Sequence, residues 1–305
     1  MTPPRVTVFG PHPLLSVTIE ARGDVDDVHL HAGGQGVWVS RAAGELGAHP
    51  VLCGFLGGET GHVLASLLEQ LPGDRRLVHT EGGSGCYVTD RRGGTRELLA
   101  RSLAEPPSRH EADDLFSVAC SAAFESQALV VCNPFPGEGF PLELYANLVA
   151  DVRAAGVPVL VDLSSPRLDS ALEGGPDIVK LNDWELAEYV VGPVDGERLR
   201  PAAERLLDAG ARAVIVTRGG EPALVVDRER ALELRPPQLT RGYREGCGDA
   251  MMGALAARLA GGDDLERALV LGAAAGAATF LRHGLATGSR EVIEDLARHV
   301  KLVGL

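Results

Sequence analysis

The stretch Tyr243-Arg244-Glu245-Gly246-Cys247-Gly248-Asp249-Ala250-Met251-Met252-Gly253-Ala254-Leu255 places two glycines and an aspartate directly before a run of helix formers. This order predicts a tight turn over 246–248 that feeds the N-terminus of a helix. The first-turn amides of a helix have no internal hydrogen-bond partner, and the helix dipole favours negative charge there. The turn is therefore a candidate anion site with the carboxylate of Asp249 at its edge. The alternative is purely structural, since Asp is also a common helix N-cap.

The composition describes a chain of 305 residues with a net charge of −13. Hydrophobic residues make up 45% and aromatic residues 4%, so the core must consist mostly of Ala, Leu and Val. The acidic balance without a basic block argues against nucleic acid or an anionic membrane as a partner. Five scattered cysteines without a Cys-x-x-Cys pattern indicate reduced thiols in a cytoplasmic protein. The sequence shows neither a signal-peptide core at its N-terminus nor an apolar run that would span a bilayer.

The middle of the chain alternates short β-branched runs with helical patterns. This alternation predicts a mostly parallel sheet covered by helices on both faces. A later pair of short runs, at 223–226 and 231–234, predicts two antiparallel strands. The buried strands are expected at 128–132, 157–162, 178–181 and 213–217, and the helices between them at 142–155, 183–190 and 201–208.

We expect one compact α/β domain over residues 1–305, because the sequence shows no linker, repeat or low-complexity segment. Two segments, approximately 10–31 and 84–101, alternate apolar and polar residues, and the second reads as a hairpin. Together they predict a small β-sheet lid beside the main sheet. The apolar residues of the first segment suggest a homodimer through the lid strands, and one solvated face would produce the same pattern. These residues are Val17, Ile19, Val28 and Leu30.

Ligands of open parallel sheets bind at the carboxyl ends of the strands. Four motifs are expected at that edge: the glycine turns at 33–36 and 246–248, and the segments 180–185 and 217–220. The glycine spacing is neither that of a Walker loop nor that of a dinucleotide fingerprint. Each glycine cluster alone is therefore more often structural than ligand-binding.

The order and spacing of these motifs resemble the ribokinase/PfkB family of sugar kinases, in particular its branch of 1-phosphofructokinases and tagatose-6-phosphate kinases. The segment 246–249 is similar to the family's Gly-Ala-Gly-Asp, and Gly33-Gly34-Gln35-Gly36 is similar to its N-terminal signature. Asn182-Asp183-Trp184-Glu185 matches the Asn-x-x-Glu motif, and Thr217-Arg218-Gly219 resembles the Ser/Thr-x-Gly near the nucleotide. The resemblance covers nearly the whole chain. It implies a ribokinase-like three-layer α/β sandwich with a mostly parallel central sheet.

The resemblance also implies ATP-dependent phosphoryl transfer, with Mg²⁺, to a hydroxyl of a sugar or sugar phosphate. Asp249 would be the general base, and Gly246, Cys247 and Gly248 would form the anion hole for the phosphoryl group. Asn182 and Glu185 would act on the metal through water, and their alternative is a helix cap with a capping-box partner. The adenine is expected near 217–224 and 272–287. The expected nucleotide-binding residues are Lys180, Asn182, Glu185, Thr217, Gly219 and Gly220.

Three departures from the family pattern fall in the expected acceptor pocket. Ser16 stands where the branch has a sugar-binding aspartate, Gln35 replaces the lysine of the signature, and Trp38 replaces an asparagine. Arginines of the lid, Arg96 among them, are candidates for binding a phosphate group of the substrate. The alternative is that they form a solvated face of the hairpin. The expected acceptor-binding residues are Ser16, Gly34, Gln35, Gly36, Trp38 and Arg96.

The altered pocket and the intact Asp249 turn leave three functions open. The first is a kinase of a sugar or sugar phosphate. The second is a kinase of a nucleoside or another alcohol, since Trp38 offers a face on which a ring can stack. The third is a nucleotide-binding regulator that has lost catalysis. The sequence names neither the acceptor nor the oligomeric state.

Cys247 stands where the family usually has alanine. A thiol at a helix N-terminus can have a lowered pKa, which would make this residue a redox switch. The alternative is a small buried filler, which is how most buried cysteines behave.

Overall fold

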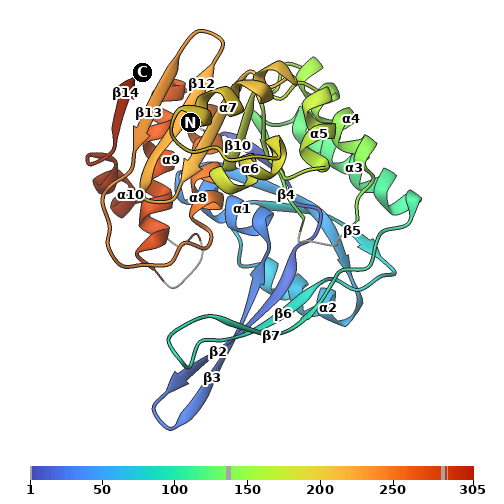
Figure 1. Cartoon of the computed structure of the whole chain (residues 1–305). Coiled ribbons are helices and arrows are strands. Elements are labelled where there is room, and N and C mark those ends of the chain that lie inside the picture. Colours follow the sequence, from blue (N-terminus) through green and yellow to red (C-terminus); the bar gives the residue numbers. More distant parts are fainter. Residues whose placement is uncertain (1, 135–138, 283–285, 287) are drawn as a thin grey trace.

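The computed structural model describes residues 2–134, 139–282, 286 and 288–305. Within these residues a ten-stranded sheet forms the middle layer (Figure 1), in the order β14-β13-β12-β11-β10-β9-β8-β1-β4-β5. The strands from β11 to β5 run parallel, and β12, β13 and β14 pair antiparallel at one edge. The strands are β1 Arg5–Phe9, β4 His49–Gly57, β5 Asp74–Thr80, β8 Ala128–Cys132, β9 Val159–Asp162, β10 Ile178–Asn182, β11 Ala213–Arg218, β12 Glu221–Asp227, β13 Ala231–Arg235 and β14 Lys301–Gly304.

Helices cover both faces of this sheet and make two separate hydrophobic layers. Successive side chains of a strand point to opposite sides of the sheet. Because helices cover both sides, the strands are apolar on both faces. In β8, Val130 and Cys132 join one layer, whereas Leu129 and Val131 join the other. One layer contains α1 Gln35–Glu45, α2 Gly58–Leu68, α8 Cys247–Ala260, α9 Leu265–Phe280 and α10 Arg290–Ala297; the other contains α3 Arg109–Phe124, α4 Leu142–Ala154, α5 Arg167–Glu173, α6 Asp183–Val190 and α7 Leu199–Asp208.

A second, four-stranded sheet projects from the body of the molecule (Figure 1) and forms the lid. Its order is β3-β2-β6-β7, and only the β2–β6 pair is parallel. Val17 of β2 lies opposite Leu30 of β3, and Ile19 lies opposite Val28. The predicted apolar residues therefore share one face. The lid strands are β2 Leu14–Arg22, β3 Val25–Gly33, β6 Cys86–Asp90 and β7 Glu97–Ser102.

The structure contains elements that the sequence analysis did not predict. Strand β5 reads Asp-Arg-Arg-Leu-Val-His-Thr and lies at the edge of the sheet, where one side of a strand stays accessible. Helix α3 begins with a capping box in which Ser108 and Glu111 exchange hydrogen bonds, a signal that was present in the sequence. Helix α5 and strand β14 were also missed. In the part of the chain that is described, no helix is both long and apolar enough to cross a membrane.

Candidate active site

Asp249 lies in the first turn of α8. The N-cap of this helix is Gly246, whose φ of 73° is a left-handed conformation that favours glycine. The helix begins at Cys247, earlier than the sequence predicted, so Cys247 and Gly248 belong to its first turn. The alternative in which Asp249 is the N-cap is wrong, because Gly246 occupies that position. The carboxylate of Asp249 is free of a capping role and is placed beside the helix N-terminus.

The first-turn amides of α8 differ in their availability. The amide of Cys247 donates to the Arg244 carbonyl at 3.4 Å, and the amide of Ala250 donates to Gly246 at 2.9 Å. Over the described residues, the amides of Gly248 and Asp249 have no backbone acceptor. The first-turn amides that are available to an anion are therefore those of Gly248 and Asp249, whereas the amide of Cys247 is already engaged.

A buried ion pair supports this turn from behind. Lys180, the third residue of β10, lies 2.6 Å from Asp162, the last residue of β9 (Nζ to Oδ2), and both side chains are 6% exposed. A Cβ atom on Gly248 would stand 2.6 Å from Nζ of Lys180, so a larger residue here would require the ammonium group to shift away from the helix. Asp162 was not predicted as a site residue. The rule that located Lys180, a charged side chain at the carboxyl end of a parallel strand, applies equally to Asp162.

The environment of Asp249 makes its carboxyl group a weaker acid than an ordinary aspartate. Burial, and then the negative charge of Asp162, raise the pKa of Asp249 to about 7, although Lys180 and a hydrogen bond from Gln35 act in the opposite direction. Asp249 as a whole residue is half-buried, although its carboxyl group is surrounded by protein atoms. A pKa near the working pH is what an efficient general base requires.

Lys180 remains charged in this cluster. Burial by itself would lower the pKa of Lys180, but the carboxylates of Asp162 and Asp249 outweigh it, and the pKa is raised. The ammonium group therefore supplies a fixed positive charge behind the N-terminus of α8.

Asn182 and Glu185 form the capping box of α6. The Asn182 side chain accepts a hydrogen bond from the Glu185 amide at 2.9 Å, and Glu185 Oε2 accepts one from the Asn182 amide at 2.8 Å. The structural alternative for this pair is thus present in the molecule. Burial and the charge of Asp162 raise the pKa of Glu185, so a nearby cation would favour its ionised form. In the described chain, no group of three or more His, Cys, Asp or Glu side chains is arranged to hold a metal ion.

The candidate nucleotide turn lies beside this pair. Thr217 of β11 is in register with Asn182 of β10, and its hydroxyl donates to the Leu181 carbonyl at 3.4 Å. Gly219 and Gly220 follow in the β11–β12 turn, where the Gly220 carbonyl accepts a hydrogen bond from Gln238 at 3.4 Å. The structure therefore brings segments 180–185 and 217–220 together, as predicted. In the expected adenine region 272–287, residues 283–285 and 287 lie outside the described residues.

The predicted acceptor residues lie between the lid and α1. Ser16 of β2 is buried and in register with Tyr87 of β6, while Gly34 is the N-cap of α1 and Gly36 lies in its first turn. Trp38 is half-buried on α1 and packs against the hydrophobic layer of that face. The side chain of Gln35, the first residue of α1, accepts a hydrogen bond from the Asn133 amide and hydrogen-bonds Asp249.

Arg96 contacts the residue that precedes the 246–248 turn. Its Nη1 lies 2.7 Å from Oε1 of Glu245, the residue before Gly246, and Nη2 of Arg91 lies 3.5 Å from Oε2 of the same carboxylate. The Arg96 guanidinium also lies over the ring of Tyr87, 5.1 Å from its centre. Glu245 and Tyr87 were not predicted as site residues. We call the contact of Arg91 and Arg96 with Glu245 the lid latch.

Arg92 fits the alternative of a solvated hairpin face, because it pairs with Asp26 and Asp90 inside the lid.

The lowered thiol pKa on which the redox interpretation of Cys247 depends is wrong. Burial, together with the charges of Asp249 and Glu245, raises the pKa of its thiol to about 12, so the thiolate is scarce at neutral pH. The thiol donates a weak hydrogen bond to the Tyr243 carbonyl at 3.4 Å. Cys247 is a small filler at the start of α8.

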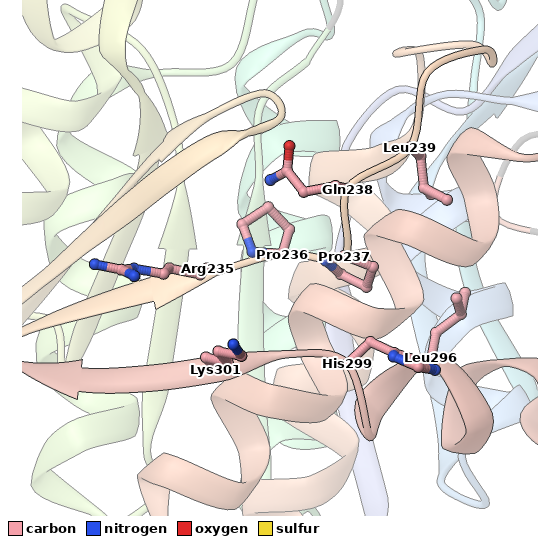
Figure 2. Close-up of a pocket in the computed structure, with 8 residues that line it drawn as sticks. All are labelled: Arg235, Pro236, Pro237, Gln238, Leu239, Leu296, His299 and Lys301. Atoms are coloured by element: carbon pink, nitrogen blue, oxygen red, sulfur yellow. The ribbon is translucent and has the colours of Figure 1, made fainter.

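A pocket of about 470 Å³ lies at the antiparallel edge of the main sheet (Figure 2). Its lining residues come from β13, the loop after it, the end of α10 and the segment leading into β14, and none of them is a predicted site residue. Its cationic side chains belong to residues at the surface, and Arg235 pairs with Glu233. The lining residues are Arg235, Pro236, Pro237, Gln238, Leu239, Leu296, His299 and Lys301.

The fold is shared with solved kinases. The crystal structure of phosphofructokinase-2 from Escherichia coli in complex with potassium has a TM-score of 0.82 to this structure, with 24% sequence identity, and the match covers 98% of this chain and 99% of that chain. The two-sheet architecture and this match define a ribokinase-like α/β fold. The predicted fold class is confirmed.

The sequence comparisons name the family. The family model described as pfkB family carbohydrate kinase matches residues 16–292. The ATP-dependent 6-phosphofructokinase isozyme 2 of Escherichia coli (strain K12) is 30% identical over 267 residues, which are 83% of this chain and 82% of that protein. The 1-phosphofructokinase of Xanthomonas campestris pv. campestris is 40% identical over 126 residues, 40% of each chain. The chain belongs to the pfkB family of carbohydrate kinases, and it is a sugar kinase.

Proposed function

We propose that this kinase transfers the γ-phosphoryl group of ATP to a hydroxyl of a sugar or sugar phosphate, with Asp249 as the general base. The observation that supports this proposal most directly is the placement of Asp249, with a pKa of about 7, beside the N-terminus of α8 and the charged Lys180. The named relatives, a 6-phosphofructokinase described as ATP-dependent and a 1-phosphofructokinase, favour ATP and a phosphorylated hexose.

In this mechanism the acceptor oxygen forms a bond to the γ-phosphorus while the bond to the β–γ bridging oxygen breaks and ADP leaves. Asp249 accepts the proton of the acceptor hydroxyl. A positioned general base typically accelerates such a step about 10²–10⁴-fold. The amides of Gly248 and Asp249, with Lys180 behind them, stabilise the negative charge on the transferred group. The loss of one such donor typically costs about 10²–10³ in rate.

The carboxylates at the strand ends fit a hydrated Mg²⁺, which usually keeps several of its waters. One oxygen of Glu185 caps α6, and no hydrogen bond to the other is seen in the described chain. We propose that Glu185 and Asn182 hold the ion through water. The ion would neutralise phosphate charge. Thr217, Gly219 and Gly220, with the adjoining residues 221–224 and α9, would hold the nucleotide.

The test is ATP consumption across a panel of free sugars, sugar phosphates and nucleosides, with Asp249→Asn measured in parallel. We expect turnover with one class of acceptor, a loss of about 10²–10⁴ in Asp249→Asn, and unchanged ATP binding. Asp114→Asn, at an exposed aspartate of α3, is the matched control and should match the wild type. Turnover that survives in Asp249→Asn would refute the base assignment.

The panel also separates the alternatives. A preference for nucleosides would favour stacking on the half-buried Trp38. ATP binding without turnover on any acceptor would favour the regulator.

We also propose a homodimer through the lid. Val28 and Leu30 are 53% and 46% exposed, and they share a face with Val17 and Ile19. A second copy offers the same apolar strands, which a self-complementary two-fold interface requires. Sedimentation should show a dimer that Leu30→Glu converts to a monomer, while His31→Glu, on the opposite face of the same strand, should leave it intact. A wild-type monomer at micromolar concentration would contradict this proposal.

A further inference from the structure

Gln35 is held at both ends of its side-chain amide. The backbone N–H of Asn133, which follows β8, donates to Gln35 Oε1. A backbone N–H can only donate, so the atom that faces it must be the oxygen, and the amide orientation is fixed. The NH₂ group of Gln35 is then the donor in its hydrogen bond to the Asp249 carboxylate.

The backbones of the two partners are also fixed relative to each other. Gln35 is the first residue of α1, and Asp249 lies in the first turn of α8. A Cβ atom on Gly253 of α8 would overlap the carbonyl oxygen of Val39 in α1, so these helices touch through their backbones. A shift of α1 therefore moves the Gln35 side-chain amide that donates a hydrogen bond to Asp249.

The other groups around Asp249 come from different elements. Asp162 on β9 and Glu185 on α6 disfavour its ionised form, and Lys180 on β10 favours it. The thiols of Cys132 on β8 and Cys247 on α8 have raised pKa values, chiefly through burial, and remain uncharged. Gln35 is an uncharged donor and comes from the helix that carries Trp38, an expected acceptor residue.

We infer that Gln35 is a positioning residue for the base: Asn133 orients its amide, and the amide holds the Asp249 carboxylate toward the acceptor. The inference rests on the proposed role of Asp249. It changes the role expected for Gln35 from substrate binding to orientation of the base. It also links the acceptor side of the site to the chemistry, because α1 carries both Gln35 and Trp38.

The sharpest test is Gln35→Glu. The glutamate keeps an oxygen for the Asn133 amide and replaces the NH₂ donor by an acceptor that repels Asp249. In the pH profile of kcat/KM for the acceptor, we expect the midpoint of the acid limb to shift to higher pH by about one unit or more. KM for ATP should stay within about twofold, and kcat should recover at alkaline pH, where Asp249 is ionised.

Gln35→Met removes both hydrogen bonds and should move the limb in the same direction by a smaller amount. A purely structural role would lower kcat equally at every pH and leave the limb in place, which would overturn the inference. Failure of the base assignment is distinguishable, because Asp249→Asn would then retain turnover in an otherwise wild-type chain.

A second measurement does not need an acceptor. Asp249 has a raised pKa in the folded state, so stability is highest when it is protonated and falls as pH rises through the folded pKa. Loss of the Gln35 donor raises only the folded pKa, so this fall in melting temperature should extend to higher pH, and Asp249→Asn should abolish the extension. A melting profile in Gln35→Glu with the same pH dependence as the wild type would overturn the inference.

Discussion

The phosphoryl side and the acceptor side of the candidate site differ in charge. On the phosphoryl side, Asp162, Lys180, Glu185 and Asp249 form a charged cluster at the strand ends. On the acceptor side, Ser16, Gln35 and Trp38 are uncharged, Arg96 is paired with Glu245, and burial lowers the pKa of the neighbouring His12 to about 4, so its imidazole is neutral at pH 7. The motifs that resemble the family's phosphoryl-transfer motifs are thus present, whereas three residues of the expected acceptor pocket depart from the family pattern.

Removal of the buried charge on the phosphoryl side should have the largest effect. Lys180→Met leaves Asp162 buried without a partner, which should cost about 3–5 kcal/mol of unfolding free energy, and turnover should fall about 10²–10³-fold. Denaturant unfolding and steady-state kinetics measure both losses. In the double variant Lys180→Met/Asp162→Asn, most of the stability should return while turnover stays low. Equal instability of the single and double variants would contradict the ion pair.

The pH dependence of activity reports on the same side. Because the pKa of Asp249 is raised to about 7, kcat/KM should fall about tenfold per pH unit below neutrality. A pH-rate profile with an acceptor that does not titrate in this range gives the midpoint. A flat profile down to about pH 5 would show that Asp249 is fully ionised, near its usual pKa.

Asp249→Asn should make the protein more stable while it removes activity. The folded-state pKa is raised, so ionised Asp249 costs stability above neutrality, and the substitution should gain about 1–3 kcal/mol at pH 8. The gain should shrink toward pH 4, where the carboxyl group is protonated in the folded chain. Thermal unfolding of both forms across pH checks this, and a constant difference would exclude the linkage to Asp249.

The acceptor side is tested by Trp38→Asn. The change removes the large apolar face and should alter KM for the acceptor between about twofold and tenfold, with KM for ATP unchanged. Phe124→Asn, at an exposed aromatic residue of α3 outside the proposed site, is the control. Equal changes in the KM values for both substrates would remove the distinction between the two sides.

The smallest effect is expected at the lid latch. Glu245 is 42% exposed in its side chain, so Glu245→Gln should cost only about 0.2–1 kcal/mol of stability. Thermal unfolding measures this change, and a loss of several kcal/mol would mean that the latch is part of the stabilising core.

The sequence predicted the parts of the fold that have a local signal. Apolar β-branched runs located β8, β10 and β11, whereas β5 was missed because its polar residues suit an accessible edge. The site motifs were located by their places at strand ends. The roles of Gln35 and Glu245 were missed because their partners are distant in the chain: Asn133 and Asp249 for one, lid arginines for the other. Charge and spacing in one dimension do not reveal such pairings.

The lid latch has a consequence for how the molecule responds to its medium. Its two ion pairs join the lid to the residue before Gly246 and are partly exposed, whereas the Lys180–Asp162 pair is sealed inside the fold. Dissolved electrolytes screen exposed charges far more than buried ones. Ionic strength therefore acts on the attachment of the lid and leaves the chemical centre almost untouched, so added salt should change how readily acceptors enter and leave before it changes how fast they react.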